Sequence, residues 1–193
     1  MLLKFLPAFA AACCLMVTGG AAKAQVIDEV SVGGYLHDVV NITDGVESNL
    51  QDLQLEVDTT RPNALRVLGA PRLNAFVTFN SAHKSDMAGA GLTWDHRLLF
   101  PRLFATLDFG LAYSDGVINP PPGHSNEYYD HYPRLLLGSN VLFRTAPGIE
   151  WHIDDHWVIG GQFIHLSNAG LLGSHHYNRG INDAGLRIGY RFR

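Results

Sequence analysis

Two side chains near the C-terminus could together break an ester bond. His165 and Ser167 lie two residues apart in the run 163–170. In a β-strand, residues two apart project from the same face. A histidine beside a serine can act as a general base, drawing the hydroxyl proton so that the oxygen attacks an acyl carbonyl. The spacing therefore predicts an acyl-transfer site, provided that this segment is a strand.

The polarity of that face decides what the pair could act on. Trp157, Ile159 and Phe163 share the parity of His165 and Ser167, so the pair would lie on an apolar, lipid-directed face. Polar groups there are costly unless they are paired and useful. Two interpretations stay open at this point: an esterase for a lipid ester, or an ordinary strand end whose polar side chains reach headgroup water.

The elements that would hold the pair are predicted from a period of two along most of the chain. Segment 103–113 has apolar residues at its odd positions, while its even positions include Thr106, Asp108 and Gly110. A bulge or bend is expected at Pro147-Gly148. The expected strands are 29–40, 50–60, 72–82, 87–98, 103–114, 134–153, 156–167 and 180–192.

An even number of strands of this length predicts an all-β, eight-stranded antiparallel transmembrane β-barrel of the bacterial outer membrane. The charged face would line a polar lumen, and aromatic residues near strand ends would form interfacial girdles. A soluble β-sandwich or a lipocalin-like barrel has the same periodicity with the apolar face inward, so it stays open. Arg193 after Phe192 departs from the aromatic end expected of such barrels. The expected girdle residues are Trp94, Tyr113, Trp151, Trp157, Tyr190 and Phe192.

Residues 1–24 are expected to be a signal peptide, which leaves 25–193 as one barrel domain. A lysine precedes the apolar run 5–17, and Ala22-Lys23-Ala24 fits a cleavage site before Gln25. A membrane anchor is the weaker interpretation, because the run is shorter than the roughly 20 residues of a spanning helix. Both cysteines lie in this segment, so the mature chain would hold no disulfide.

The charge pattern argues against nucleic acid as a partner. The net charge is −4 with histidine neutral, and no block of basic residues occurs. His175 and His176 could touch lipid phosphates or a metal, but without further ligands at fixed spacing a solvated loop is the simpler interpretation. The histidine- and tyrosine-rich run 124–132 is expected in an external loop. No metal or other cofactor is expected.

A set of short segments carries a more specific pattern. They are 137–144 (LGSNVLFR), 155–157 (DHW), 165–170 (HLSNAG), 178–182 (NRGIN) and 189–192 (GYRF). Together they resemble the lipid A 3-O-deacylase (PagL-type, acyloxyacyl hydrolase) family. The resemblance implies an outer-membrane barrel with an active site on its outer wall, which hydrolyses the acyl ester at the 3-position of lipid A without a metal. It implies Ser167 as nucleophile and His165 as general base.

The third catalytic residue is where this chain departs from the family pattern. Where the resemblance implies a glutamate, the chain has Asn182. By strand alternation Asn182 shares the face of His165, whereas Asp183 points to the lumen. An asparagine can fix a histidine tautomer but cannot stabilise an imidazolium by charge. Asn182 is the expected orienting residue, with Asp183 or no third residue as alternatives. The resemblance also implies Asn168 and the amide of Gly170 as oxyanion donors.

The resulting prediction is an outer-membrane esterase of a Gram-negative bacterium that removes a 3-O-linked acyl chain from lipid A in lipopolysaccharide. The alternative is a non-catalytic small barrel that stabilises the membrane or contacts a partner through the loop 115–133. The amide at Asn182 keeps that alternative open. A soluble periplasmic lipid carrier is a third interpretation. The acyl chain removed, a phospholipid substrate and a homodimer are left open.

Overall fold

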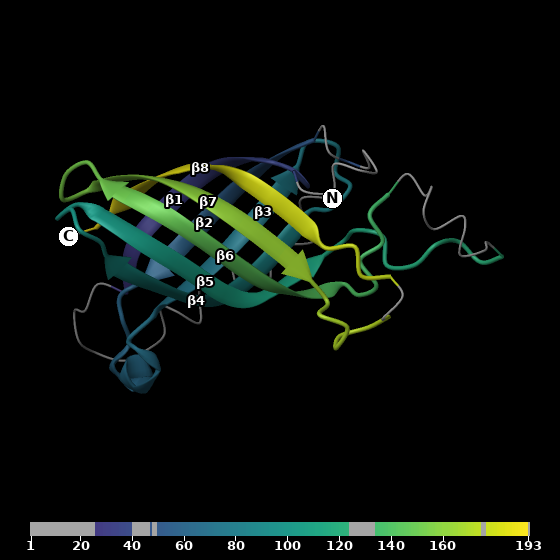
Figure 1. Cartoon of the computed structure of the whole chain (residues 1–193), viewed down its shortest axis with the longest axis horizontal. Coiled ribbons are helices and arrows are strands. Elements are labelled where there is room, and N and C mark those ends of the chain that lie inside the picture. The colour runs from purple at the N-terminus through teal and green to yellow at the C-terminus, as the bar shows by residue number, and fades with distance from the viewer. Residues whose placement is uncertain (1–25, 40–46, 48–49, 124–133, 175–176, 193) are drawn as a thin grey trace.

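The computed structural model describes residues 26–39, 47, 50–123, 134–174 and 177–192, so the expected signal peptide lies outside the described residues. Within them, eight antiparallel strands close into a barrel, each bonded to its neighbours in the chain and the last to the first (Figure 1). The predicted fold class is confirmed. The strands are β1 (Ile27–Leu36), β2 (Gln51–Thr59), β3 (Arg72–Asn80), β4 (Met87–Arg97), β5 (Leu103–Ser114), β6 (Val141–His152), β7 (Trp157–Ser167) and β8 (Ile181–Arg191), with a short 3-10 helix, η2 (Asn63–Leu68), before β3.

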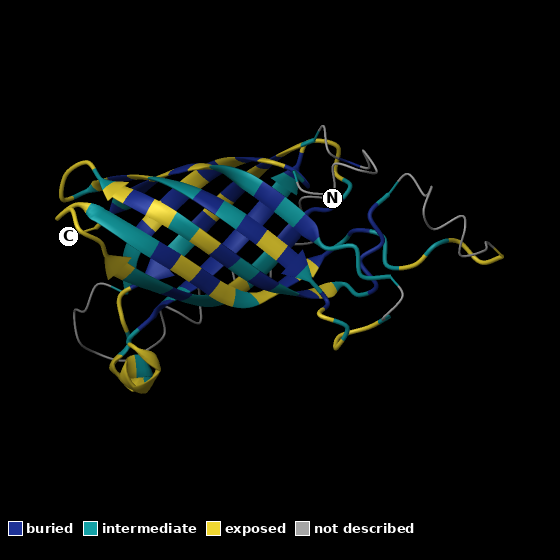
Figure 2. Ribbon diagram, viewed as in Figure 1, coloured by how far each residue is buried: buried dark blue, intermediate teal, exposed yellow. Residues whose placement is uncertain are grey.

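Burial alternates along most of the strands and makes a chequered wall (Figure 2), although β3 is buried at several consecutive positions. In β2 the polar side chains of Asp52, Gln54 and Glu56 are buried, whereas Leu53 and Leu55 are exposed. Polar residues therefore face inward and apolar residues outward, the reverse of a water-soluble protein. The soluble sandwich and lipocalin-like alternatives are wrong for this reason. A closed ladder with an apolar exterior satisfies every strand backbone inside a bilayer.

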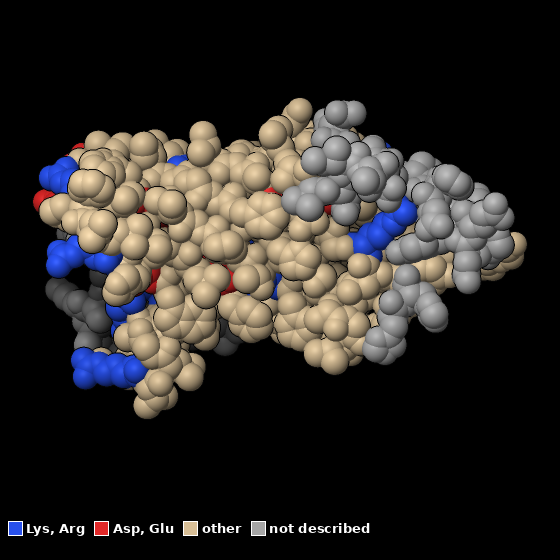
Figure 3. Space-filling model, in the orientation of Figure 1, with Lys and Arg blue, Asp and Glu red and all other residues tan. Residues whose placement is uncertain are grey.

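Paired charges fill the lumen. Arg144 contacts Asp108 at 3.0 Å and Glu56 at 3.3 Å, and Arg187 contacts Glu56 at 2.7 Å and also Glu150. Breaking such a buried pair leaves an uncompensated charge, which is strongly destabilising. Figure 3 shows the complementary exterior: a broad band along the wall where few charged side chains reach the surface, with most of the arginine and lysine side chains visible on this face gathered toward one end. The predicted polar lumen is confirmed.

The exterior aromatic residues cluster near strand ends, as expected for interfacial girdles. Trp157 and Tyr190 pack edge to face with ring centroids 5.1 Å apart, and Tyr190 meets Phe192 at 5.3 Å. Tyr113 is exposed at the opposite end of the wall. Trp94 differs from the others, because its Nε1 donates to the carbonyl of Leu68 and ties η2 to the barrel.

Two strand boundaries differ from the sequence expectation. Strand β1 ends at Leu36 rather than near residue 40, because Asp38 adopts a left-handed turn with φ of 49°. Strand β6 begins at Val141 rather than at 134, because Gly138 is left-handed with φ of 68°. The preceding residues 134–140 instead pack over the end of the barrel, where Leu136 is fully buried.

The bulge expected at Pro147-Gly148 is not there. Thr145 lies opposite His165 and Gly148 opposite Gln162, so the register between β6 and β7 does not shift, although the ladder pairs neither Ala146 nor Pro147 with β7. Proline has no N–H to donate, yet the strand passes through it without adding a residue. The irregularity in register occurs instead between β1 and β2, near the start of β1.

The two ends of the barrel are unequal. The turns 98–102 and 153–156 are short and lie at the end where β8 finishes, as does the longer connection 60–71 with η2, whereas 115–140 and 168–180 connect strands at the other end (Figure 1). Small outer-membrane barrels have short periplasmic turns and longer external loops. The end with the long connections, the loop end, is therefore expected to face the cell exterior. No helix in the part of the chain that the structure describes is long and apolar enough to cross a membrane.

Candidate active site

His165 meets Asn182 across neighbouring strands at the loop end. They are direct partners in the register of β7 and β8, and His165 Nδ1 lies 2.8 Å from Asn182 Oδ1. An amide oxygen can only accept, so this contact requires the proton on Nδ1. It leaves the Nε2 lone pair available, which is the tautomer that a general base needs. The structure thus brings together the histidine and the residue expected to orient it.

Ser167 occupies the last position of β7, two residues beyond His165 and on the same outer face. Its strand partner is Phe143 in β6, and it is half-buried while His165 is exposed. Among the described residues, no hydrogen bond joins the Ser167 hydroxyl to His165. Nucleophile and base are often further apart without substrate and draw together in the complex. The pair is adjacent, on the lipid face, and not yet engaged.

A glycine packs against the histidine ring. A Cβ on Gly180 would lie 3.0 Å from His165 Cε1 and 2.8 Å from the carbonyl oxygen of Leu166. The chain entering β8 can therefore pass this close to the imidazole because residue 180 has no side chain. The turn that precedes Asn182 thereby limits where the ring can lie.

The two expected oxyanion donors are engaged within the loop that follows Ser167. The Asn168 side chain is fully buried, and its Nδ2 donates to the carbonyls of Leu137 at 3.0 Å, Ser174 at 3.2 Å and Tyr177 at 3.3 Å. The backbone N–H of Gly170 donates to Asn168 Oδ1 at 2.6 Å. Asn168 therefore ties three stretches of backbone together beside the nucleophile.

Close packing of small residues completes that loop. Asn178 Oδ1 accepts the backbone N–H of Asn168 at 2.9 Å. A Cβ on Gly138 would lie only 1.8 Å from the carbonyl oxygen of Tyr177. The segments 137–144, 165–170 and 178–182, which stood out in the sequence, thus meet in one packed unit around the end of β7.

Asp183 lies on the other side of the wall from His165. It is buried in the lumen, where its Oδ1 is 3.3 Å from His37 Nδ1 and accepts the backbone N–H of Asp38 at 3.0 Å. Asp183 therefore does not contact His165, and the alternative that made it the orienting acid is not supported by this geometry. The face assignment that favoured Asn182 agrees with the observed alternation.

Comparison with known families adds the decisive observation. The model of the family described as Lipid A 3-O-deacylase (PagL) matches residues 70–191, more than half of the chain. The chain belongs to the lipid A 3-O-deacylase family. This membership and the barrel fold place the protein in the bacterial outer membrane. A search of curated protein sequences found no match.

Solved structures agree on the fold of this family member. The crystal structure of the outer membrane enzyme PagL aligns with a TM-score of 0.55 at 15% identity, covering 83% of this chain and 97% of that chain. The N-terminal β-barrel domain of Pseudomonas aeruginosa OprF aligns with a TM-score of 0.51 at 10% identity, covering 87% and 98%. At these identities the likeness concerns the barrel alone.

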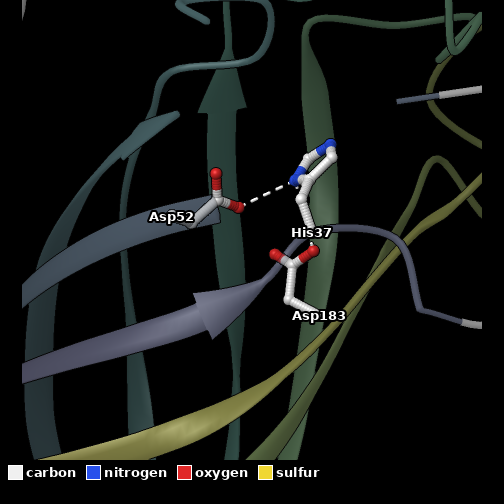
Figure 4. Close-up of side chains that lie close together, drawn as sticks. All are labelled: His37, Asp52 and Asp183. Carbon is white, nitrogen blue, oxygen red and sulfur yellow. Dashed lines mark hydrogen bonds and ion pairs between the residues drawn. The ribbon is translucent and has the colours of Figure 1, made fainter. Parts of the chain in front are cut away.

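The sequence reasoning missed a buried charge cluster at the loop end of the lumen. His37, just beyond β1, has Nδ1 2.7 Å from Asp52 Oδ2 (Figure 4). Its Nε2 lies 3.5 Å from Glu47 Oε2. Burial alone would lower the pKa of His37, but hydrogen bonds to Asp183, Asp52 and Glu47 outweigh it and raise the pKa to about 12. The available signal was parity, since His37 continues the inward positions of β1.

The same cluster is the place where a metal ion could be held among the described residues. His37, Asp52 and Asp183 each offer one ligand atom, and these atoms lie within 4.8 Å of one another. His37 Nδ1 already lies 2.7 Å from Asp52 and 3.3 Å from Asp183, so a metal ion bound to this nitrogen would have to displace the proton that the two carboxylates share. His175, His176 and the run 124–132 lie outside the described residues.

An apolar groove crosses the outer wall on the same face as His165 and Ser167. Its volume is about 660 Å³. A Cβ on Gly34 would meet nothing within 4 Å, so the missing side chain leaves a depression. Gly161, which lines the groove, lies four residues before His165 along β7 and shares its outward parity. The groove is lined by residues of β1, β2, β6, β7 and β8, among them Gly34, Leu53, Ile149, Ile159, Gly161 and Leu186.

Proposed function

We propose that this protein hydrolyses a 3-O-linked acyl ester of lipid A in the outer leaflet. The observation that carries the proposal is the 2.8 Å contact between His165 and Asn182 on the outer wall, beside Ser167, in a member of this family. A pair on that wall faces lipid rather than water. Its substrate must therefore present an ester at the level where acyl chains join the headgroup.

The proposed reaction proceeds by acyl transfer through Ser167. His165 Nε2 takes the hydroxyl proton as Ser167 Oγ attacks the ester carbonyl carbon. The tetrahedral intermediate collapses, the bond to the sugar 3-oxygen breaks, and His165 returns the proton to that oxygen. A water molecule, deprotonated by His165, then attacks the acyl-serine. The fatty acid leaves and Ser167 regains its hydrogen.

Asn182 orients the base in this scheme without adding charge. Its Oδ1 accepts from Nδ1–H and so keeps Nε2 unprotonated, ready to take the proton of Ser167. It does not offset the positive charge that His165 acquires as the proton moves. The proposed enzyme is accordingly slower than one with a carboxylate at this position.

The backbone amide expected to bind the oxyanion must first be released from a hydrogen bond within the loop. Because the N–H of Gly170 already donates to Asn168 Oδ1, the Gly170 amide can serve the oxyanion once that bond is released. Asn168, with Nδ2 held by three carbonyls, contributes mainly by shaping the loop.

The outer-wall groove supports a lipid substrate, since it offers an apolar channel to an acyl chain on the same face.

Covalent labelling tests the nucleophile separately from the substrate. A fluorophosphonate probe reacts with an activated serine, so the folded barrel in detergent micelles is expected to be labelled at Ser167. Ser167→Ala should abolish labelling and His165→Ala should lower it by about a hundredfold or more, the usual contribution of a general base. Ser81→Ala, at an exposed serine in the turn between β3 and β4, is the matched control and should label like the unmodified protein.

A non-catalytic barrel is the second candidate. Two observations favour it: the amide at Asn182 and the unengaged hydroxyl of Ser167. Absence of Ser167 labelling in a correctly folded barrel would support this candidate against the esterase.

Cleavage before Gln25 is a separate proposal that N-terminal sequencing of the mature protein would check.

A further inference from the structure

The chain just after β1 continues along β8 and hydrogen-bonds Asn182 and Asp183, the β8 residues just before those that pair with β1. Regular pairing between β1 and β8 ends with Leu36 opposite Ala184. Beyond it, the N–H of Asp38 donates to Asp183 Oδ1 at 3.0 Å, and the N–H of Val39 donates to the carbonyl of Asn182 at 2.7 Å. The left-handed turn at Asp38 lets the chain make both contacts.

His37 anchors this crossing from inside the lumen. Its ring is fully buried and contacts Asp52 from β2 and Asp183 from β8 (Figure 4). Residues 37–39, Asp52 and Asp183 together are called the seam latch below. The latch joins the first two strands to the last one at the point where the barrel closes, with every member buried or half-buried.

The latch acts on the peptide units on either side of Asn182 and Asp183. The Asp183 side chain is held in the lumen, and the carbonyl of Asn182 is held by Val39. Successive strand side chains point to opposite faces. With the backbone of both residues fixed, the Asn182 amide has one direction to take, outward toward His165.

A neutral orienting residue depends on such placement. A hydrogen bond to an ionised carboxylate is roughly twice as strong as one between neutral groups. A carboxylate at position 182 would therefore be held against the imidazole by the strength of that bond itself. Asn182 has no charge to do so. We propose that the seam latch is a positioning device, whose lumen contacts hold the Asn182 amide against His165 on the outer wall. This inference rests on the proposed function of His165 and Ser167.

Two variants and one matched control separate positioning from general stability. His37→Gln removes the imidazole, and Asp183→Asn keeps the shape while removing the charge. Glu29→Gln is the control, because Glu29 lies in β1, the strand that leads to His37, is buried, and pairs with Arg72 at the far end of the lumen. Folding of each is checked by heat-modifiable gel migration in micelles.

The readout is the ¹⁵N spectrum of His165, assigned by its loss in His165→Gln. In the unmodified protein it should report a proton held on Nδ1 by Asn182. His37→Gln and Asp183→Asn should shift it toward a mixture of tautomers and lower kcat by about ten- to a hundredfold, as small misplacements of catalytic groups do, with KM within about twofold. Glu29→Gln should leave the spectrum and kcat unchanged.

An unchanged His165 spectrum in both folded latch variants would overturn the inference, as would an equal change in Glu29→Gln. If His37→Gln does not fold, Asp183→Asn decides the question. If the unmodified protein leaves lipid A intact, the proposed function fails, and the spectrum still decides whether the latch positions Asn182.

Discussion

At the scale of single residues, the candidate site is unusual in its orienting group. The register places Asn182 opposite His165, and the amide oxygen makes the hydrogen bond that fixes the histidine tautomer. Tautomer control and charge stabilisation are separable contributions, and an asparagine supplies the first alone. Substitutions at residue 182 can therefore measure the contribution of charge stabilisation separately from that of tautomer control.

Replacing Asn182 by aspartate adds the missing charge with little change in shape. Asn182→Asp is expected to raise kcat by about tenfold, which corresponds to about 1.4 kcal/mol, because a charge-assisted hydrogen bond stabilises the imidazolium that forms. Asn182→Ala should lower kcat below that of the unmodified protein. Steady-state hydrolysis of lipid A in micelles checks both, and equal rates for all three proteins would show that residue 182 does not orient the base.

At the scale of elements, the loop after β7 is held by backbone contacts more than by apolar packing. Asn168 binds three carbonyls, and Gly138 allows the chain at Tyr177 to approach within a distance that no Cβ would tolerate. Glycine also adopts the left-handed backbone at residue 138 without strain. The position of Ser167 therefore depends on a turn that is distant in the sequence.

Gly138→Ala should displace this loop. Both the left-handed φ of 68° and the 1.8 Å approach to Tyr177 oppose a methyl group there, so the expected loss is about 1–3 kcal/mol of loop stability with reduced labelling of Ser167. Gly123→Ala is the control, since Gly123 is also left-handed but a Cβ there would meet nothing within 4 Å. Hydrogen exchange of the loop amides measures the effect, and identical exchange in both variants would contradict the account.

The elements themselves were largely predictable from the sequence. Strict alternation, as in β5, fixes both the strand and the face of each side chain, so His165, Ser167 and Asn182 could be assigned to the outer wall. The start of β6 could not be predicted in this way, because residues 134–140 have strand-like apolar character but pack over the barrel end. His37 was missed because one of its partners, Asp183, becomes its neighbour only when the last strand closes against the first, although Asp52 lies on the adjacent strand β2.

At the scale of the whole molecule, the barrel has a polar interior and an apolar exterior, so buried ionic groups carry much of its specificity. The His37 cluster is expected to make the free energy of unfolding of the barrel depend on pH. Hydrogen bonds to Asp183, Asp52 and Glu47 outweigh burial and raise the pKa of His37 from 6.5 to about 12. A raised pKa means that the folded state holds the proton more tightly than the unfolded state does.

The stabilisation from His37 should be complete below about pH 6.5 and decline as the pH rises toward 12. The decline is at most about 1.4 kcal/mol per pH unit for one such group. Unfolding by guanidinium in micelles at pH 7 and pH 10 measures it. His37→Gln should lose less stability over this interval than the unmodified barrel, and an equal loss in both would show that His37 is not the group responsible.

If Ser167 removes an acyl chain from lipid A, the lipid itself should record it. The measurement is mass spectrometry of lipid A from Gram-negative cells that produce the protein, beside cells that produce Ser167→Ala. Lipid A should lose one 3-O-linked acyl chain in cells with the unmodified protein and stay intact in cells with the variant. Identical lipid A in both strains, with heat-modifiable folded barrel in both outer membranes, would contradict it.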